Sequence, residues 1–466
     1  MKRSKRLGIL LCVLLLVCGA TFAALRYEER REAIQNTAAV LLEVSADSVT
    51  SLSWEYEGET LSFHRDGKWL YDSDEAFPVD EETIASFLAR FESFGASFVI
   101  EDVEDYGQYG LNKPICTIRF STEDQSYEVL LGDYSKMDSQ RYISIGDGNV
   151  YLVKDDPLDD FDAALNDMID NDETPSYDKV TALRFSGGEN YEITYQEDSA
   201  ATYCADDVYF TERNGKALPL DTSRVNSYLS KIKNLSLTDY VTYNAAEEEL
   251  KAYGLDDPEL TVAMDYTHED HNGKEASATF TLHVSRDPET RKASGDSDEQ
   301  DEGREITAYA RVGDSRIVYR ISSDSYQSLM AASYDDLRHP EVLSADFEDV
   351  TQLDITLEGE RYTLTSSKEK DGRSWSYGGE ELEIGDLQEA LEALRADSFT
   401  TEKPAQKEEI SLTVYLDNEN FPQVKIDLYR YDGSYCLAVV DGESVSLVER
   451  SQVVDLIEAV YAIVLY

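Results

Sequence analysis

One four-residue pattern recurs three times along this chain and constrains its fold more than any other feature. It reads VTSL at residues 49–52, VTAL at residues 180–183 and VTQL at residues 350–353. Each copy opens a stretch in which apolar and polar residues alternate, as they do in a half-buried β-strand. Because self-similarity at this spacing marks repeated structural units, the sequence predicts three related modules rather than one large core.

The same motifs follow the opening strand in the same order. Two stretches continue into a Gly turn and a Trp, as DGKW at residues 66–69 and DGRSW at residues 371–375, which predicts β-hairpins. The second stretch has no clear counterpart of this motif. Each stretch then contains an amphipathic helix, with Asp80 and Asp221 as expected N-caps of the first two and an apolar stripe from Leu387 in the third.

A turn and further strands complete each repeat. The turn reads YGLNKP at residues 109–114 and YGLDDP at residues 253–258, and it is missing from the third repeat. Its Gly permits a sharp reversal and its Pro prevents a helix from continuing. We expect each repeat to end in a helical segment, at residues 161–168, 326–337 and 452–460.

These patterns predict an α+β protein with three modules of mainly antiparallel sheet and packed helices. Module 1 spans residues 45–172, module 2 residues 178–338 and module 3 residues 348–466, with linkers at 171–178 and 339–347. Module 2 is longer because of a polar insertion at about 267–305, which we expect to form a mobile loop.

Residues 1–31 differ from the rest of the chain. A basic head with Lys2, Arg3, Lys5 and Arg6 precedes an apolar run at residues 7–25. As a helix this run would be about 28 Å long, which matches a bilayer core of about 30 Å. We therefore expect a transmembrane signal anchor with a cytoplasmic N-terminus and the bulk of the chain outside the cell membrane. A cleaved signal peptide, ending at the TFA of residues 21–23, is the alternative.

The formal net charge of −53 excludes some partners. Residues 1–31 are basic, so the exterior is more acidic still, and such a surface repels nucleic acid and anionic lipid. After the apolar run only Cys116, Cys204 and Cys436 remain, too few for a disulfide framework.

No catalytic, cofactor-binding or metal-binding residues are predicted, because the chain contains no GxSxG, P-loop or HExxH motif. Two SxxK matches, at 230–233 and 367–370, lack their partner motifs. A metal site would need His268, His271 and His283 to converge. Two acidic stretches do not fit the register of a calcium-binding loop; they contain Asp155, Asp156, Asp159 and Asp160, and Asp296, Asp298 and Asp301.

The anchor, the VTxL strand, the DGxW hairpin, the capped helix and the YGLxxP turn together resemble the family called domain of unknown function 4340. The resemblance covers nearly all of the chain after residue 45. It implies a membrane-anchored extracytoplasmic protein, often associated with ABC-type transport systems, including those linked with gliding motility. It supplies no catalytic residues.

The expected function is therefore a non-enzymatic accessory or scaffolding subunit of such a transport system, with no cofactor. The 31 tyrosines leave an alternative open, because aromatic side chains stack on sugars as well as filling strands. That alternative is a surface module that binds glycans or wall polymer. A hydrolase is a further alternative that no motif supports.

Overall fold

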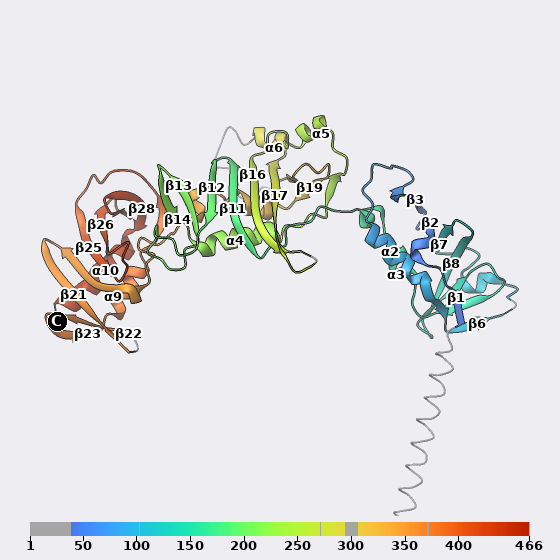
Figure 1. Cartoon of the computed structure of the whole chain (residues 1–466), viewed down its shortest axis with the longest axis horizontal. Coiled ribbons are helices and arrows are strands. Elements are labelled where there is room, and N and C mark those ends of the chain that lie inside the picture. Colours follow the sequence, from blue (N-terminus) through green and yellow to red (C-terminus); the bar gives the residue numbers. More distant parts are fainter. Residues whose placement is uncertain (1–38, 102, 271, 294–305, 371, 466) are drawn as a thin grey trace, which may run out of the picture. The chain divides into compact units, whose positions relative to one another are not determined.

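The computed structural model describes residues 39–101, 103–270, 272–293, 306–370 and 372–465 (Figure 1). These residues form two compact units that divide between Asn171 and Asp172. The predicted anchor, His271 and the acidic residues at 296–301 lie outside the described residues. No helix within those ranges is both long and apolar enough to cross a membrane.

Three antiparallel sheets with matching strand orders dominate the structure, one in each predicted module. The order is β4-β3-β2-β7-β8-β9-β10-β6 in module 1, β14-β13-β12-β11-β16-β17-β18-β19-β15 in module 2 and β23-β22-β21-β20-β25-β26-β27-β28-β24 in module 3. In each sheet the strand that carries the VTxL pattern lies in the interior, third from one edge in module 1, which has one strand fewer, and fourth in modules 2 and 3. The repeated motifs therefore mark a repeated topology, as expected.

The strands of module 1 are β2 (Val49–Tyr56), β3 (Glu59–Asp66), β4 (Lys68–Tyr71), β6 (Phe98–Ile100), β7 (Cys116–Thr122), β8 (Ser126–Ser135), β9 (Gln140–Ser144) and β10 (Val150–Val153), with a separate pair of β1 (Ala39–Leu42) and β5 (Phe94–Ala96). Those of module 2 are β11 (Lys179–Gly187), β12 (Tyr191–Tyr195), β13 (Tyr209–Arg213), β14 (Lys216–Pro219), β15 (Tyr240–Thr242), β16 (Leu260–Glu269), β17 (Glu275–Arg286), β18 (Ala308–Val312) and β19 (Val318–Ile321). Those of module 3 are β20 (Val350–Leu357), β21 (Glu360–Glu369), β22 (Gly372–Tyr377), β23 (Glu380–Leu382), β24 (Ala396–Phe399), β25 (Glu408–Leu416), β26 (Gln423–Arg430), β27 (Tyr435–Val440) and β28 (Glu443–Glu449).

The structure explains why Val and Thr recur at the first two positions of the VTxL pattern. The Val is buried in all three modules. The register of the central strand pair shifts just after it, at the Thr, in every module. Each Thr hydroxyl donates a 3.2 Å hydrogen bond to a carbonyl of the neighbouring strand, at Ser121, Asp265 and Tyr415. The pattern thus marks a β-bulge, at which the Val side chain packs in the core and the Thr hydroxyl bonds to the neighbouring strand.

The predicted helices form with the predicted caps. Asp80 accepts hydrogen bonds from the backbone N–H groups at the start of α2 (Glu81–Ala89), and Asp221 does the same for α4 (Thr222–Lys233). The equivalent helix of module 3 is α9 (Gly385–Glu392). The remaining helices are α3 (Leu158–Phe161), α5 (Glu247–Ala252), α6 (Pro288–Ala293), α7 (Ser323–Met330), α8 (Tyr334–Leu337) and α10 (Arg450–Val464), with 3-10 turns at Ala46–Ser48, Arg90–Ser93, Tyr106–Tyr109, Leu165–Met168 and Phe347–Asp349.

Each helix packs its apolar stripe on its own sheet. In module 1 the ring of Phe87 lies 5.9 Å from that of Trp54, and in module 2 the rings of Tyr228 and Phe185 lie 5.5 Å apart. In module 3 Leu387 and Leu391 belong to the same buried cluster as Leu353. The sheet-and-helix arrangement expected from the sequence is therefore present in all three modules.

Two expectations about irregular segments were wrong where the structure describes them. Most of the described residues in 267–293 form the end of β16, β17 and α6 rather than a loop, because Thr and Ser alternate with buried residues along β17. Residues 294–305 of the predicted insertion lie outside the described residues. Residues 339–347, expected as a linker, contribute the buried side chains of Val342, Leu343 and Phe347 to the core of module 3. Polar composition misled the first expectation, since one face of this hairpin is exposed.

Candidate functional site

Module 2 differs from modules 1 and 3 at one hairpin, where the other two modules have the Gly turn. A single residue, Gly67, joins β3 to β4, and residues 370–371 join β21 to β22, whereas β12 and β13 are joined by residues 196–208. Tyr209 opposes Tyr195 just as Trp69 opposes Arg65 in module 1 and Trp375 opposes Ser366 in module 3. Module 2 thus keeps the strand register and replaces the tight turn with a longer loop.

This loop, residues 196–208, packs on module 3. The ring of Tyr203 lies against the hydrophobic core of module 3, with its centroid 5.5 Å from that of Phe421. Arg338, at the end of α8, stacks on Phe399 of β24 with its guanidinium carbon 4.1 Å from the ring centroid. The two modules of the second unit therefore share an apolar contact beside the loop.

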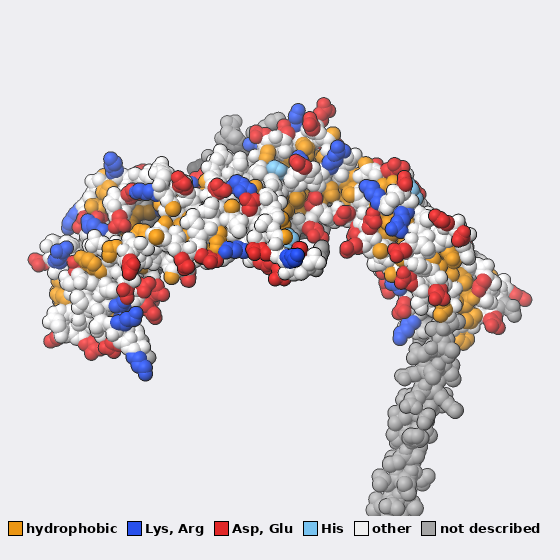
Figure 2. All heavy atoms as spheres, viewed as in Figure 1, with side chains coloured by type: hydrophobic (Ala, Val, Ile, Leu, Met, Phe, Trp, Pro, Cys, Tyr) orange, Lys and Arg blue, Asp and Glu red, His pale blue; other side chains and the backbone are white. Residues whose placement is uncertain are grey.

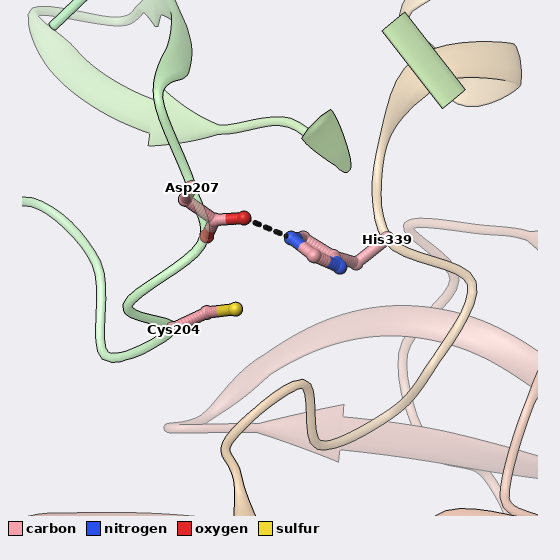
Figure 3. Close-up of side chains that lie close together, drawn as sticks. All are labelled: Cys204, Asp207 and His339. Carbon is pink, nitrogen blue, oxygen red and sulfur yellow. Dashed lines mark hydrogen bonds and ion pairs between the residues drawn. The ribbon is translucent and has the colours of Figure 1, made fainter. Parts of the chain in front are cut away.

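Cys204 and Asp207 from this loop meet His339, which follows α8 (Figure 3). Asp207 Oδ1 lies 2.8 Å from His339 Nε2, and the Cys204 sulfur points toward the same space. One donor atom from each of the three side chains lies within 4.8 Å of the others. These side chains line a cavity of about 450 Å³. Its wall also includes Asp221, Glu341 and Arg395 from module 2 and module 3, together with Leu343 and Phe347.

His339 lies between two carboxylates. Its Nδ1 is 3.7 Å from Glu341 Oε2, on the opposite side of the ring from Asp207. Burial alone would lower the pKa of His339, but the bonds to Asp207 and Glu341 outweigh it and raise that pKa to about 9. The imidazole is therefore protonated at neutral pH and neutralises a buried carboxylate.

Asp207 is the most buried member of the cluster, with 1% of its side chain exposed. Its Oδ2 accepts a 2.6 Å hydrogen bond from the Thr202 hydroxyl. The same hydroxyl oxygen accepts a 3.0 Å hydrogen bond from the backbone N–H of Cys204. Thr202 thus holds Asp207 and Cys204 in one arrangement, and the loop is ordered around these polar groups.

Cys204 does not have the environment of an activated nucleophile. Burial and the nearby negative charge of Asp207 raise the pKa of its thiol to about 11. A catalytic cysteine needs the opposite shift, toward a thiolate at neutral pH. The trio is better suited to bind a cation than to attack an electrophile, since thiol sulfur, imidazole nitrogen and carboxylate oxygen are metal donors.

A second set of donors shares His339. Asp221, His339 and Glu341 also have donor atoms within 4.8 Å of one another. Both carboxylates of this set have structural roles. Asp221 caps α4, and Glu341 forms a 2.9 Å ion pair with Arg395. Of the two donor sets, the trio of Cys204, Asp207 and His339 is therefore the one that includes sulfur.

The candidates considered from the sequence do not come together. His283 faces Thr261 across β16 and β17, whereas His268 faces Ala276, seven residues along the same strand pair. At about 3.3 Å per residue this separates them by roughly 23 Å, too far to share a metal. Burial lowers the pKa of His283, whose ring nitrogen lies 3.0 Å from the Thr261 hydroxyl.

The other candidates have local structural partners. The Ser230 hydroxyl donates to the Asn226 carbonyl within α4, and the Ser367 hydroxyl is 3.0 Å from that of Ser374 across a hairpin. Asp156 and Asp160, from the acidic stretch considered for calcium, are each paired with an arginine. The ion pair with Arg141 accounts for the burial of the Asp156 carboxylate.

The cluster is not predicted from the sequence, because its members come from a loop and from a segment expected to be a linker. One signal was present. Module 2 lacks the DGxW motif of the other modules, and an interruption of a repeat marks the place where an insertion is accommodated. The insertion carries Thr202, Cys204 and Asp207. Which histidine would meet them depends on how α8 packs against the start of α4, a contact between residues far apart in the sequence that no local pattern encodes.

Comparison with known proteins gives one family. The family described as "Domain of unknown function (DUF4340)" matches residues 69–258 and 213–413. The two matches overlap and together cover most of the chain, including parts of all three modules. No curated protein matches the chain.

Proposed function

The chain belongs to the DUF4340 family, and on this premise we propose that it is a non-enzymatic, membrane-anchored accessory subunit on the outer side of a bacterial ABC-type transport system, of the kind linked with gliding motility. The proposal draws on the basic head and apolar run at residues 1–31 and on the family's association with such systems. Its role would be to scaffold or present partners through repeated modules.

The observation that best supports a protein partner is a group of exposed apolar side chains in module 1. Phe98 is 59% exposed, Tyr134 46% and Met137 91%. Phe98 lies on the edge strand β6, whereas Tyr134 lies on β8 and Met137 in the turn that follows it, with β9 and β10 between the two places. Exposed aromatic and Met side chains are typical of interfaces between proteins.

The position of these side chains suits a membrane-embedded partner. Module 1 follows the predicted anchor directly, and β1 begins at Ala39. A partner in or near the bilayer would therefore meet module 1 first. Modules 2 and 3 carry acidic side chains spread over the visible face of the second unit (Figure 2), which keeps them soluble and repels nucleic acid.

The glycan-binding alternative has less support. All three tryptophans, Trp54, Trp69 and Trp375, are buried in their module cores. Several tyrosines are core residues as well, including Tyr228 and Tyr319. Sugar stacking would have to rely on the remaining tyrosines of the strands.

Site-specific photo-crosslinking in intact cells tests the proposal. A photoreactive residue at Met137 should capture a permease or ATP-binding component, whereas the same residue at Glu380, on edge strand β23 of module 3, serves as the control. A Phe98→Ser/Met137→Ser variant should reduce recovery of the transporter in mild detergent. Repeated failure of both the crosslink and the pull-down to yield any transporter component would overturn the proposal. Glycan-array binding that is abolished by Tyr substitution would favour the alternative.

A further inference from the structure

We propose that Cys204, Asp207 and His339 form a zinc-binding site that fixes loop 196–208 of module 2 to the segment leading into module 3. The donor set is the first argument. Thiolate sulfur, imidazole nitrogen and carboxylate oxygen are the three kinds of protein ligand that Zn²⁺ accepts, whereas Mg²⁺ and Ca²⁺ require oxygen ligands. A thiolate and an imidazole together select a borderline-soft ion.

The spacing of the donors is the second argument. Around a tetrahedral zinc ion with bonds of about 2.0–2.3 Å, neighbouring donor atoms are roughly 3.3–3.7 Å apart. The donor atoms of Cys204, Asp207 and His339 all lie within 4.8 Å of one another, and Asp207 and His339 are in direct contact. Side-chain shifts of about 1 Å therefore suffice to coordinate the ion. The three side chains line the cavity, from which water could supply a fourth ligand.

The surrounding hydrogen bonds are the third argument. A histidine that binds a metal through one ring nitrogen commonly donates its other N–H to a carboxylate. When His339 Nε2 faces the metal, its Nδ1 faces the Glu341 carboxylate, whose Oε2 lies 3.7 Å away. Asp207 is held through its other oxygen by Thr202, which also accepts the backbone N–H of Cys204. Glu341 and Thr202 are thus positioning residues for the proposed ligands.

Burial of Asp207 is the fourth argument. With 1% of its side chain exposed, this carboxylate has little water around it, and a bound cation would compensate its charge. Cys204 would bind as a thiolate. Since the three ligands come from two segments separated by more than a hundred residues, the ion would also cross-link the contact between modules 2 and 3.

Zinc binding by the full chain tests this site. The protein, purified in mild detergent and stripped with a chelator, is titrated with Zn²⁺ against a competing chelator in millimolar Mg²⁺. The excess Mg²⁺ occupies surface carboxylates, of which this acidic chain has many. We expect one zinc ion per chain. Cys204→Ser and His339→Gln should each weaken binding by at least 100-fold, and Glu341→Gln by about 10–100-fold.

His268→Gln is the matched control, since it makes the same change at a histidine on β16, outside the cluster, and should leave the affinity unchanged. Cobalt provides a second readout. A thiolate-to-cobalt charge-transfer band should appear with the wild-type chain and disappear in Cys204→Ser, which keeps the size of the side chain. If His339→Gln does not fold, the cobalt spectrum of Cys204→Ser still decides.

Two results would overturn the site. One is a dissociation constant above about 10 μM for the wild-type chain, which corresponds to adventitious binding. The other is equal zinc affinity and an equal cobalt spectrum in wild type and Cys204→Ser. The test is independent of the transporter proposal, because it uses the isolated chain and concerns module 2 and module 3 only.

Discussion

Two buried aspartates, one in each unit, show how the surroundings of a buried carboxylate decide whether it is a structural group or a potential metal ligand. In module 1 both oxygens of Asp156 accept from Arg141 Nε, at 2.6 and 2.7 Å, and Oδ1 also accepts the N–H of Leu158. Arg141 in turn donates to the Gly132 carbonyl. In module 2 Asp207 instead lies beside His339 and Cys204 at the wall of a cavity.

The partners explain the difference. A guanidinium keeps its proton at any pH a protein tolerates, so the pair of Arg141 and Asp156 cannot exchange its proton for a metal ion. An imidazole can, and a thiol beside it adds a third donor. Burial of a carboxylate alone does not mark a functional site. A partner that releases its proton, together with access to a cavity, distinguishes Asp207 from Asp156.

Isosteric substitution of the two aspartates should give the largest contrast. Asp156→Asn leaves a charged guanidinium buried without its counter-ion, which should cost about 3–5 kcal/mol of unfolding free energy in the first unit. Asp207→Asn should cost only about 1–2 kcal/mol in the second unit, because His339 can lose its proton when its partner is removed. Urea denaturation followed by hydrogen exchange and mass spectrometry resolves the two units.

The double variant Arg141→Met/Asp156→Leu is the control for this prediction. Replacing both partners with apolar side chains should recover most of the lost stability. Equal destabilisation by Asp156→Asn and Asp207→Asn would contradict the distinction between the two aspartates.

Zinc should stabilise one unit and not the other. At a free concentration about 100 times the dissociation constant, Zn²⁺ should add about 2.7 kcal/mol to the unfolding free energy of the second unit. The first unit, whose buried carboxylate is paired with arginine, should be unchanged. The same denaturation experiment with and without zinc measures both. Equal stabilisation of both units would indicate general binding to surface carboxylates.

Glu259, in module 2, is a further carboxylate whose oxygens already accept several hydrogen bonds. It accepts hydrogen bonds from the side chain and backbone N–H of Arg286, both at 2.8 Å, and from the Tyr326 hydroxyl at 3.0 Å. Burial alone would raise the pKa of Glu259, but these bonds outweigh it and hold the pKa below its ordinary value of 4.5. We therefore place Glu259 with Asp156, as a structural carboxylate.

A pH series on Glu259→Gln checks this assignment. Because the folded pKa lies below the unfolded value, the stability from Glu259 is present above about pH 4.5 and is lost as pH falls through the folded pKa. At pH 7 the variant should lose about 1.5–3 kcal/mol, and its difference from wild type should shrink below about pH 4.5. A difference that stays constant down to pH 4 would show that the carboxylate is not bonded as described.

Alkylation of cysteine should give the smallest contrast. Cys204 is partly exposed, whereas Cys116 and Cys436 are buried in their sheets. Zinc should slow alkylation of Cys204 several-fold and leave the slow labelling of the other two unchanged. Peptide mapping after timed quenching separates the three sites. Protection of all three by zinc would point to a general change in stability instead.

The sequence was sufficient to predict the repeated architecture because each repeat is locally encoded. The VTxL pattern, the Asp caps and the YGLxxP turn act within a few residues of where they stand, and each recurs. The edge strands β6, β15 and β24 were not predicted. They are short and return to the far side of the sheet after the helix, so their pairing depends on non-local contacts.

The candidate site could not be predicted from local sequence patterns either, because it also depends on non-local contacts. Cys204 and Asp207 are close in sequence, but His339 is 132 residues from Asp207 and reaches it only in the folded second unit. Acidic residues gave no guidance, since a chain with 95 of them has carboxylates near almost any other residue. The useful signal was the place where module 2 broke the repeat.

X-ray absorption at the zinc edge on the zinc-loaded full chain identifies the atoms bound to the ion. We expect a first shell with one sulfur at about 2.3 Å and nitrogen or oxygen ligands at about 2.0–2.1 Å, and loss of the sulfur in Cys204→Ser. A first shell of oxygen atoms alone would contradict this expectation and would place Asp207 with the structural carboxylates.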